Sequence, residues 1–316
     1  MIAFFLRRLT AAILVLAAVT FVVFLIVYLS PGDPVKTLLG QSATAEQIAG
    51  MRARLGLDLP FHEQYGAWLW RVAHGDFGRS ISTQVPAMSI LLPAFGNTLI
   101  LALSSLFLSL LFGIAIGVTS GFRAGRLLDK VLMFFTEVLA ATPVFWLGLI
   151  LIWIFARELG WLPSSGMRNM RARGSSLDLL AHLVLPSIAA SVLAISIIAR
   201  LVRGAVIDVL ASDYVKIAQA AGMSSFRIFR KQVWRNILPP IISVGGLQFG
   251  TLFGGVIFVE AVFAWPGISA QLFNAITAGD VAVIQAGVLM IAATFVAINL
   301  VVDMVLVWLN PRRALS

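Results

Sequence analysis

The sequence contains no cysteine and only three histidines, His62, His74 and His182. Without cysteine there is no disulfide framework, thiolate metal site or cysteine nucleophile, and the scattered histidines form no HExxH or paired-His site. No glycine is followed by lysine, which excludes a Walker A phosphate loop. Any nucleotide energy that the protein uses must therefore come through another chain.

Charged residues are also scarce, at 12% of the chain, whereas 60% of residues are hydrophobic and the mean hydropathy is +0.98. A soluble domain carries about 25% charged residues. Several apolar runs reach or approach the roughly 20 residues that cross a bilayer. The net charge is +9, which by itself could indicate a nucleic-acid partner. The charges lie in short loops beside apolar runs, where they set membrane topology, so we expect an all-α membrane protein and no nucleic acid.

Six membrane spans are predicted, at Leu9–Leu29, Phe95–Gly121, Val131–Ala156, Leu183–Leu201, Ile237–Val259 and Val281–Leu309. The first apolar run is longer than the core of about 7–15 residues in a signal peptide, so we expect a retained span. Pro143 interrupts the third span and is expected to kink it. We predict three parts: residues 1–93 with the first span and an extracytoplasmic segment, a core of five helices at 94–309, and a cytoplasmic tail at 310–316.

An even number of spans places both termini on one side of the membrane. Most of the 23 Lys and Arg residues fall in the segments that would then be inside, and cytoplasmic loops carry such an excess. We therefore predict that both termini are cytoplasmic. The basic residues of loop 157–173, which would lie outside, oppose this assignment: Arg157, Arg168, Arg171 and Arg173.

The extracytoplasmic segment after the first span has its own helical patterns. Glu46–Leu55 has apolar residues at spacings of three and four, and Tyr65, Trp68 and Val72 repeat that spacing. We expect a packed appendage without a ligand site.

The segment between the fourth and fifth spans, residues 213–239, combines small and basic residues. Ser212 or Asp213 can cap one helix and Ser224 or Ser225 a second. Residues 218–222 have almost no side-chain bulk, and Gly222 can end the first helix with a positive φ. The second helix would place Phe226, Phe229 and Val233 on one stripe and lie along the inner membrane surface. The simpler interpretation is a basic loop that only fixes topology.

This order of features resembles the EAA loop of ABC importer permeases, most closely that of the dipeptide/oligopeptide/nickel branch, which reads like DYVxxAxAxG followed by a basic segment and Leu-Pro. Ile217 stands where the wider family has Glu. Further motifs of the branch follow in family order at Ser30–Pro34, Leu55–Pro60, Gly75–Ser80, Asn97–Leu99, Thr142–Phe145, Glu260–Gly267 and Asn310–Arg312. The long segment after the first span resembles the B-type of the two permease subunits.

The resemblance implies a type I ABC importer permease fold in the bacterial inner membrane. Such a chain is a non-catalytic half of a translocation pathway, has no cofactor of its own, and leaves ATP and Mg to its partners. Those partners would be a second homologous permease, two ABC ATPases, an extracytoplasmic binding protein and membrane lipid. Within a coupling loop at 203–236, the ATPase-coupling residues implied are Asp213, Tyr214, Lys216, Ala218, Ala220, Ala221, Gly222, Met223 and Ser224.

Three carboxylates are candidates for a pathway or gate, together with Pro143. Glu137 and Asp303 lie within spans, where a charge usually faces a cavity or a partner. Each can instead be hydrogen-bonded between helices, or reach water. Glu260, with Trp265, stands at the outer end of the fifth span and could meet the binding protein or anchor the helix. Small residues of the fifth span form a face for the partner permease or the pore wall: Gly245, Gly246, Gly250, Gly254 and Gly255.

Two other classes of protein would show different features. A stand-alone secondary transporter or channel would show intramembrane charge pairs or inverted repeats, and neither is clear here. An intramembrane enzyme would need a nucleophile or a metal constellation. The substrate stays open among dipeptides, longer peptides, nickel chelates and glutathione, because selection lies largely in the binding protein of such systems.

Overall fold

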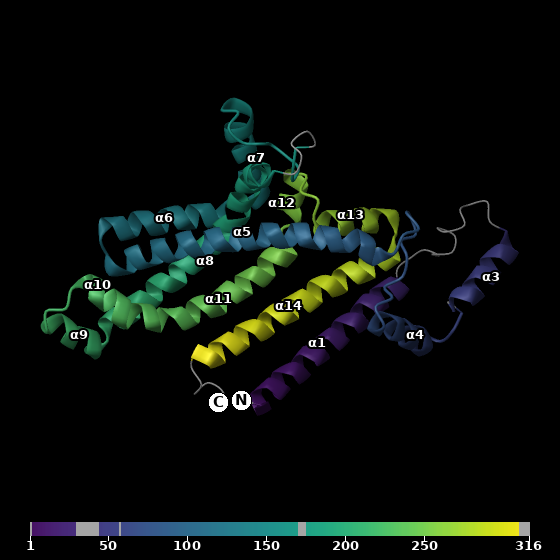
Figure 1. Ribbon diagram of the computed structural model, residues 1–316, viewed down its shortest axis with the longest axis horizontal. Helices are drawn as coiled ribbons and strands as arrows, with labels where there is room; N and C mark the ends of the chain where they lie inside the picture. Colours follow the sequence, from purple (N-terminus) through teal and green to yellow (C-terminus); the bar gives the residue numbers. More distant parts are fainter. Residues whose placement is uncertain (1, 30–43, 57, 170–174, 310–316) are drawn as a thin grey trace. The chain divides into compact units, whose positions relative to one another are not determined.

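The computed structural model describes residues 2–29, 44–56, 58–169 and 175–309 of the 316-residue chain (Figure 1). These residues are helical, with one isolated antiparallel bridge between Arg79 and Pro86. The motifs at Ser30–Pro34 and Asn310–Arg312, the tail 310–316, and Arg171 and Arg173 lie outside the described residues.

The helices are, in chain order, α1 (Ile2–Leu29), α3 (Ala45–Leu55), α4 (Phe61–Ala73), α5 (Ala87–Phe122), α6 (Leu127–Ala141), α7 (Val144–Leu151), the π-helical η1 (Ile152–Glu158), α8 (Ser176–Ala211), α9 (Asp213–Ala220), α10 (Ser225–Ile228), the π-helical η2 (Phe229–Val233), α11 (Trp234–Gly255), α12 (Ile257–Val262), α13 (Ile268–Ala278) and α14 (Val281–Leu309).

Within the described ranges, five helical segments are long and apolar enough to cross a membrane, and a sixth is present if the bent pair α6 and α7–η1 is one span. The all-α prediction is thereby confirmed, and the six predicted spans correspond to these five helices together with the bent pair. The last span has the predicted limits, whereas α8 begins and ends well outside Leu183–Leu201. Residues 203–211, which we placed in the coupling loop, therefore belong to α8.

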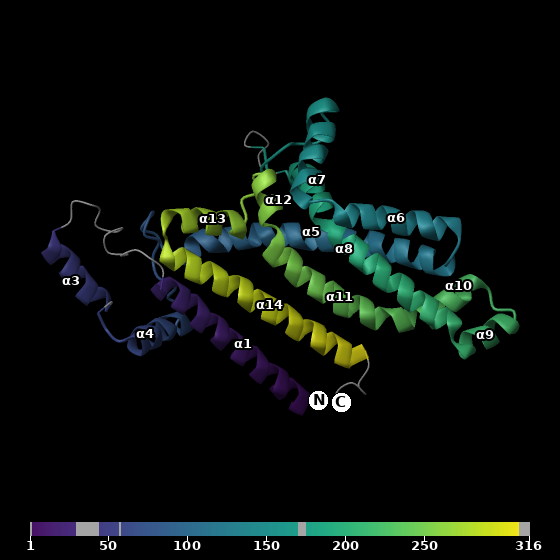
Figure 2. The same cartoon turned by 180° about the vertical axis from the view of Figure 1, so that it is seen from behind.

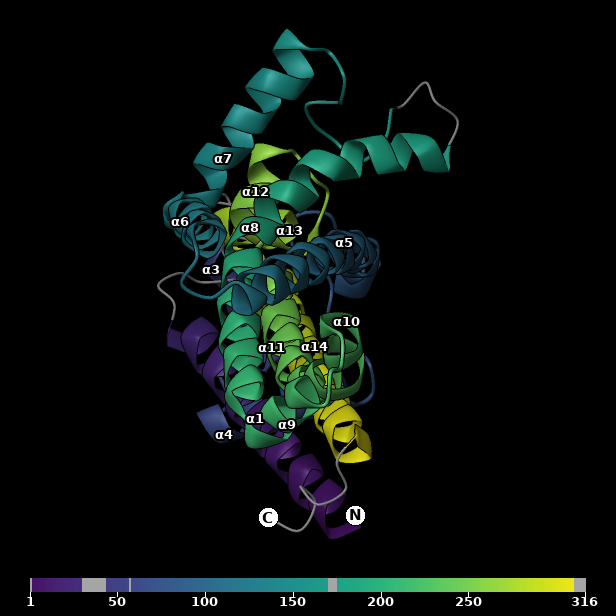
Figure 3. The same ribbon diagram turned by 90° about the vertical axis from the view of Figure 1, so that its left-hand side faces the viewer.

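The third span is broken rather than kinked. The axes of α6 and α7–η1 differ by 101° across Thr142–Pro143, and α7 turns away from α6 (Figure 3). Proline lacks the backbone N–H that would continue the helix, and its ring forces the preceding residue into an extended conformation. Thr142 has ψ 125° and Pro143 has ψ 130°, so two successive residues leave the helix.

The chain forms two compact units that interleave along the sequence. One consists of Met1–Phe4, Thr98–Pro266 and Ala297–Ser316, and the other of Phe5–Asn97 and Gly267–Val296. The predicted boundary between residues 93 and 94 stays a prediction, because the two units are defined by contacts within the chain and not by position in the membrane.

The first unit is centred on α8. Gly113, Gly117 and Gly121 form a stripe on α5 that lies against Ile198, Val202 and Val206 of α8. A Cβ atom at Gly117 would lie 2.6 Å from the backbone oxygen of Ala199, so the two helices approach as closely as glycine permits. Their apolar core continues into Ile237 and Ile241 of α11.

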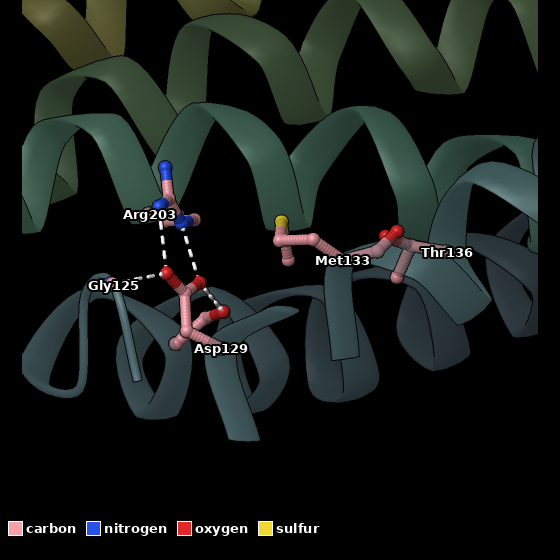
Figure 4. Close-up of polar contacts among 6 residues, drawn as sticks. Gly125, Asp129, Met133, Thr136 and Arg203 are labelled. Carbon is pink, nitrogen blue, oxygen red and sulfur yellow. Dashed lines mark hydrogen bonds and ion pairs between the residues drawn. The ribbon is translucent and has the colours of Figure 1, made fainter. Parts of the chain in front are cut away.

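A buried ion pair joins α6 to α8 (Figure 4). Arg203 donates two hydrogen bonds of 2.7 Å to the carboxylate of Asp129, which is 2% exposed. Ser120 Oγ, at 2.5 Å, and the backbone N–H of Gly125, at 2.8 Å, donate to the same carboxylate. The contacts therefore tie the α5–α6 turn to α8.

In the second unit, the segment after α1 packs on two apolar clusters. Phe24, Trp68 and Leu289 are buried together, and Ala87 and Leu91 are buried with Ile268 and Val283. The carboxylate of Asp280 accepts hydrogen bonds from the hydroxyls of Ser80 and Ser82. α3 and α4 cover the two predicted helical patterns, so both are confirmed.

Candidate functional site

The segment with the most specific sequence pattern forms a short helical projection, which we call the α9–α10 tip (residues 212–228). It follows α8 directly and is joined to α11 by η2, and α8 and α11 lie side by side (Figures 1 and 2). Ser212, in extended conformation, ends α8 and begins α9. Gly222 has φ +78° and Ser224 is extended again before α10. The prediction that Gly222 ends the first helix with a positive φ is confirmed.

The tip is fixed to the ends of the spans by apolar side chains. Val215, Ala218 and Ile228 are buried, and Val215 and Ile228 belong to the cluster that contains Val202 and Val206 of α8. Each fully buried Val or Ile side chain contributes about 1.5–3 kcal/mol. The tip is therefore packed on α8 and α11 and is not a loose loop.

The residues predicted to couple to an ATPase divide into two groups. Two of them face inward, since Ala218 is buried and Met223 packs on the same core. The other seven are exposed: Asp213, Tyr214, Lys216, Ala220, Ala221, Gly222 and Ser224. For Ala218, the structure corrects the expectation of a direct contact, because its side chain holds the tip in place.

Two exposed apolar side chains on the tip were missed. Ile217 is 69% exposed and Phe226 is 72% exposed, one on each side of the Gly222 turn. Ile217 stands where the wider family has Glu, and this departure was a sequence signal that its side chain is exposed. Phe226 was predicted to share an apolar stripe with Phe229 and Val233, whereas Ile228 and Val233 are the side chains that α10 and η2 bury.

Serine stands at both expected N-cap positions, but the expected capping hydrogen bonds do not form. Ser212 and Ser224 are the N-cap residues of α9 and α10, and neither side chain accepts a capping hydrogen bond. The Ser212 hydroxyl instead donates to the Val209 carbonyl at 2.5 Å. Asp213 in the first turn pairs with Lys216 at 3.0 Å, and its charge favours the helix N-terminus.

The second helix of the loop is not a separate helix on the membrane surface. Ser225–Gly254 is one continuous helical span, in which η2 joins α10 to α11 without a break. Our prediction of an amphipathic helix at Phe226–Arg235 lying along the membrane is therefore wrong. The π-helical turns shift the register, and they bury Val233 with Ile237.

Glu137, a predicted pathway residue, lies on α6 and pairs with Arg200 of α8 at 3.2 Å. The two side chains are 54% and 58% exposed in this chain. Charged groups within spans usually face a cavity or another protein rather than lipid. The pair thus resembles neither a buried tie, such as Asp129–Arg203, nor a lipid-facing surface.

The other carboxylates have different surroundings. Glu260 on α12 is 1% exposed and accepts a 2.6 Å hydrogen bond from Thr98 Oγ1. Trp265 is completely buried. Both side chains are therefore inaccessible to a binding protein at the surface of this chain, and of our two interpretations the structure favours the anchor. Asp303 is half-buried on α14.

The glycine face of the fifth span is partly occupied within the chain. A Cβ atom at Gly246 would lie 2.1 Å from a methyl group of Val302 on α14, and one at Gly245 would touch Leu110 on α5. At these two glycines, the absence of a side chain is therefore used for packing within the chain, and contact of this face with a partner permease or a pore wall stays a prediction.

Comparisons with known proteins identify the family. Residues 109–315 match the family described as the inner membrane component of binding-protein-dependent transport systems, and residues 1–106 match its N-terminal companion. The chain belongs to this family. The permease is 37% identical to a dipeptide transport system permease protein of Alkalihalophilus pseudofirmus, with 99% of each chain covered.

Two further relatives have similar coverage. The permease is 36% identical to a di/tripeptide transport system permease protein of Pseudomonas aeruginosa, over 99% of this chain and 98% of that one. It is 38% identical to a glutathione transport system permease protein of Salmonella choleraesuis, over 98% of both. Its fold matches a chain of the inward-facing MetNI methionine ABC transporter with a TM-score of 0.54, at 21% identity, over 71% of this chain and 97% of that one.

Family membership decides between the classes that the sequence left open. The permease is a multi-pass, non-catalytic inner membrane subunit of a bacterial ABC importer, and it works with ATPase and binding-protein partners. It is not a stand-alone transporter or channel. Among the described residues, no group of three or more His, Asp or Glu side chains could hold a metal ion.

Proposed function

We propose that this permease forms half of the pathway of a peptide importer, and that the exposed face of the α9–α10 tip is its contact with an ATPase. The observation that carries this proposal is the contrast within the tip. Val215 and Ile228 are buried in the core, while Ile217 and Phe226 are exposed on either side of a sterically open Gly222. A soluble partner with an apolar groove would cover these side chains.

The proposed mechanism follows from how the tip is attached. A second homologous permease would complete the pathway, and each permease would bind one of two ATPases. Closure of the ATPases on ATP would displace the tip, and the displacement would pass through the buried side chains to α8 and α11. ATP and the loaded binding protein would thus favour one of two packings of the same helices.

The proposed substrates are peptides or peptide-like solutes. The relatives that cover 98–99% of this chain are named for dipeptide, di/tripeptide and glutathione transport. These substrates share amide bonds, a free amino group and carboxylates.

We propose that Glu137 and Arg200 face the translocation pathway, where water or a zwitterionic substrate can replace their mutual contact. The half-exposure of both side chains supports this position, because lipid contact would be costly. The break at Thr142–Pro143 follows the end of α6, six residues after Glu137, and provides a position at which α7 can change its angle. Asp303 stays a candidate for a gate on α14, whereas buried Glu260 is better explained as an anchor.

Gly222→Trp tests the coupling proposal, and Gly125→Trp is its matched control. Gly222 and Gly125 have φ of +78° and +79°, and a Cβ atom at either would meet nothing within 4 Å. The left-handed conformation costs a side-chain-bearing residue roughly 1–2 kcal/mol, so the strain is equal in both variants. We expect Gly222→Trp to abolish dialanine uptake by the assembled transporter while its amount in the membrane is unchanged.

Gly125→Trp is expected to retain most of the uptake, because Gly125 lies outside the tip. Ile217→Asp provides a variant without backbone strain, and it should reduce the amount of ATPase that copurifies with the permease. Normal uptake by Gly222→Trp, or an equal loss in the Gly125 variant, would contradict the assignment of this surface.

A further inference from the structure

A small cavity lies in the first unit, beside the start of α7. Its volume is about 160 Å³, and it is bounded by Val144 of α7, Leu193 of α8, and Gln248 and Thr251 of α11. None of the side chains that line it is charged. Val144, which begins α7 directly after the break at Thr142–Pro143, is part of its wall.

Gln248 is the unusual residue of this cavity. Its side chain is 94% buried, since it is 6% exposed. Within the part of the chain that the structure describes, its amide has no hydrogen-bond partner, while every fully enclosed side-chain polar atom has one. The amide must therefore reach open space, and the space that Gln248 lines is the cavity. An unpaired buried amide costs about 1–3 kcal/mol, so a ligand or water is expected there.

The chemistry of the lining restricts the ligand. The glutamine amide offers both N–H donors and a carbonyl acceptor. The Thr251 hydroxyl donates to the Gln248 carbonyl of the backbone at 2.9 Å, which leaves its oxygen free to accept. A peptide group presents one N–H and one C=O, which complement this pair. The apolar walls at Val144 and Leu193 suit a small neutral side chain rather than an ion.

We infer that this cavity is a substrate-contact site of the pathway, in which Gln248 hydrogen-bonds a peptide group of the passing solute. The inference rests on the proposed function as a peptide importer. A volume of about 160 Å³ is below the roughly 300–1,000 Å³ of complete small-molecule sites. The cavity therefore holds one peptide unit, and the rest of the substrate lies in the pathway outside it.

The test uses the assembled transporter in liposomes, with its partner permease, ATPases and binding protein. Labelled dialanine is supplied on the side of the binding protein. Gln248→Leu removes the amide at nearly constant volume. One lost hydrogen bond corresponds to a roughly two- to tenfold fall in peptide taken up per ATP hydrolysed. Gln248→Asn, which retains a neutral amide on a shorter side chain, should recover part of the loss. Gln285→Leu is the control, because Gln285 is equally buried on α14 but does not line the cavity.

A second measurement does not depend on the Leu variant folding well. The chain contains no cysteine, so Gln248→Cys provides a single thiol in a clean background. A small methanethiosulfonate reagent should modify it, and dialanine supplied during turnover should slow that modification. Glutathione uptake is measured in parallel as the second peptide probe.

The outcomes separate this inference from the proposed function. In the first case, the unaltered transporter takes up dialanine or glutathione, Gln248→Leu has a normal peptide yield per ATP, and the thiol is not protected. This result overturns the substrate site alone and leaves a water-filled cavity. Failure of the unaltered transporter to take up either peptide overturns both. Reduced yield in Gln248→Leu but not in Gln285→Leu, together with thiol protection, supports the site.

Discussion

Asp129 and Arg203 form an ion pair whose carboxylate is enclosed in the interior of the first unit. The carboxylate is enclosed and accepts hydrogen bonds from Arg203, Ser120 and the Gly125 backbone. A buried charge is tolerated when its partner and its hydrogen bonds are all present, and removing one partner leaves the other uncompensated. The pair therefore specifies how the α5–α6 turn and α8 meet, whatever its net contribution to stability.

We predict that Arg203→Met destabilises the permease by about 3–5 kcal/mol, because Asp129 would stay buried without its counter-charge. The measurement is the thermal unfolding midpoint of the detergent-solubilised permease. The double variant Asp129→Asn with Arg203→Met should recover part of the loss. Lys216→Met, which removes an exposed partner of Asp213, should barely change the midpoint. Similar midpoints for the two single variants would refute the argument.

The sequence offered no signal for this pair. Asp129 and Arg203 are 74 positions apart, and neither lies at a spacing that a single helix would make meaningful. By contrast, the positive φ of Gly222 and the interruption at Pro143 are properties of one residue and its neighbours, and both could be predicted. Gln248 was missed for the same reason as Asp129, because its environment is set by distant parts of the chain. Described residues of three other helices surround it, and none of them forms a hydrogen bond to its side-chain amide.

Glycines decide how closely α5 and α8 pack. Gly113, Gly117 and Gly121 recur every four residues and so share one face of α5. Opposite them, Ile198, Val202 and Val206 recur with the same period on α8. Small residues at such spacing let helix backbones approach closely in membranes, where van der Waals packing drives association. The four-residue repeat of glycine within an apolar span is a signal that the sequence contains, as it does for the glycines of the fifth span.

We predict that Gly117→Leu separates α5 from α8 and that Gly204→Leu does not. A side chain at Gly117 would meet the Ala199 backbone oxygen at 2.6 Å, which no rotamer change relieves, whereas a Cβ atom at Gly204 meets nothing within 4 Å. Overpacking of this kind costs about 1–3 kcal/mol or more. Unfolding midpoints of the two variants provide the measurement. An undisturbed midpoint for Gly117→Leu would show that the helices can shift apart freely.

Helix limits could be predicted where hydropathy alone sets them. α14 has the predicted limits because apolar residues fill it from end to end. α8 extends at both ends into polar sequence, where packing on its neighbours keeps it helical. The run from Ser225 into α11 shows the same effect, since tertiary contacts at Ile228 and Val233 carry the helix through residues that we assigned to a surface helix. Local periodicity does not contain that information.

At the scale of the whole molecule, the family and the arrangement of spans agree with the sequence, whereas the orientation in the membrane rests on charge counting. Most basic residues lie in the segments proposed to be inside, and the others lie in residues 30–93 and in loop 157–173. The location of the loop matters, because the α9–α10 tip can meet an ATPase only if it is cytoplasmic. The orientation of that tip and of the loop must therefore be opposite if the proposed function holds.

Single cysteines test this orientation directly, since the native chain has none. Trp70→Cys on α4 and Trp161→Cys in the basic loop replace strongly exposed side chains on the proposed outer side. Ala124→Cys lies in the exposed α5–α6 turn on the proposed inner side, away from the tip that an ATPase would cover. We expect a membrane-impermeant maleimide to label the first two in right-side-out vesicles and Ala124→Cys only in inverted ones.

Labelling of Trp161→Cys from the inner side would mean that the basic loop follows the positive-inside rule. The bent pair α6 and α7–η1 would then be a re-entrant segment rather than a span, and the chain would cross the membrane five times.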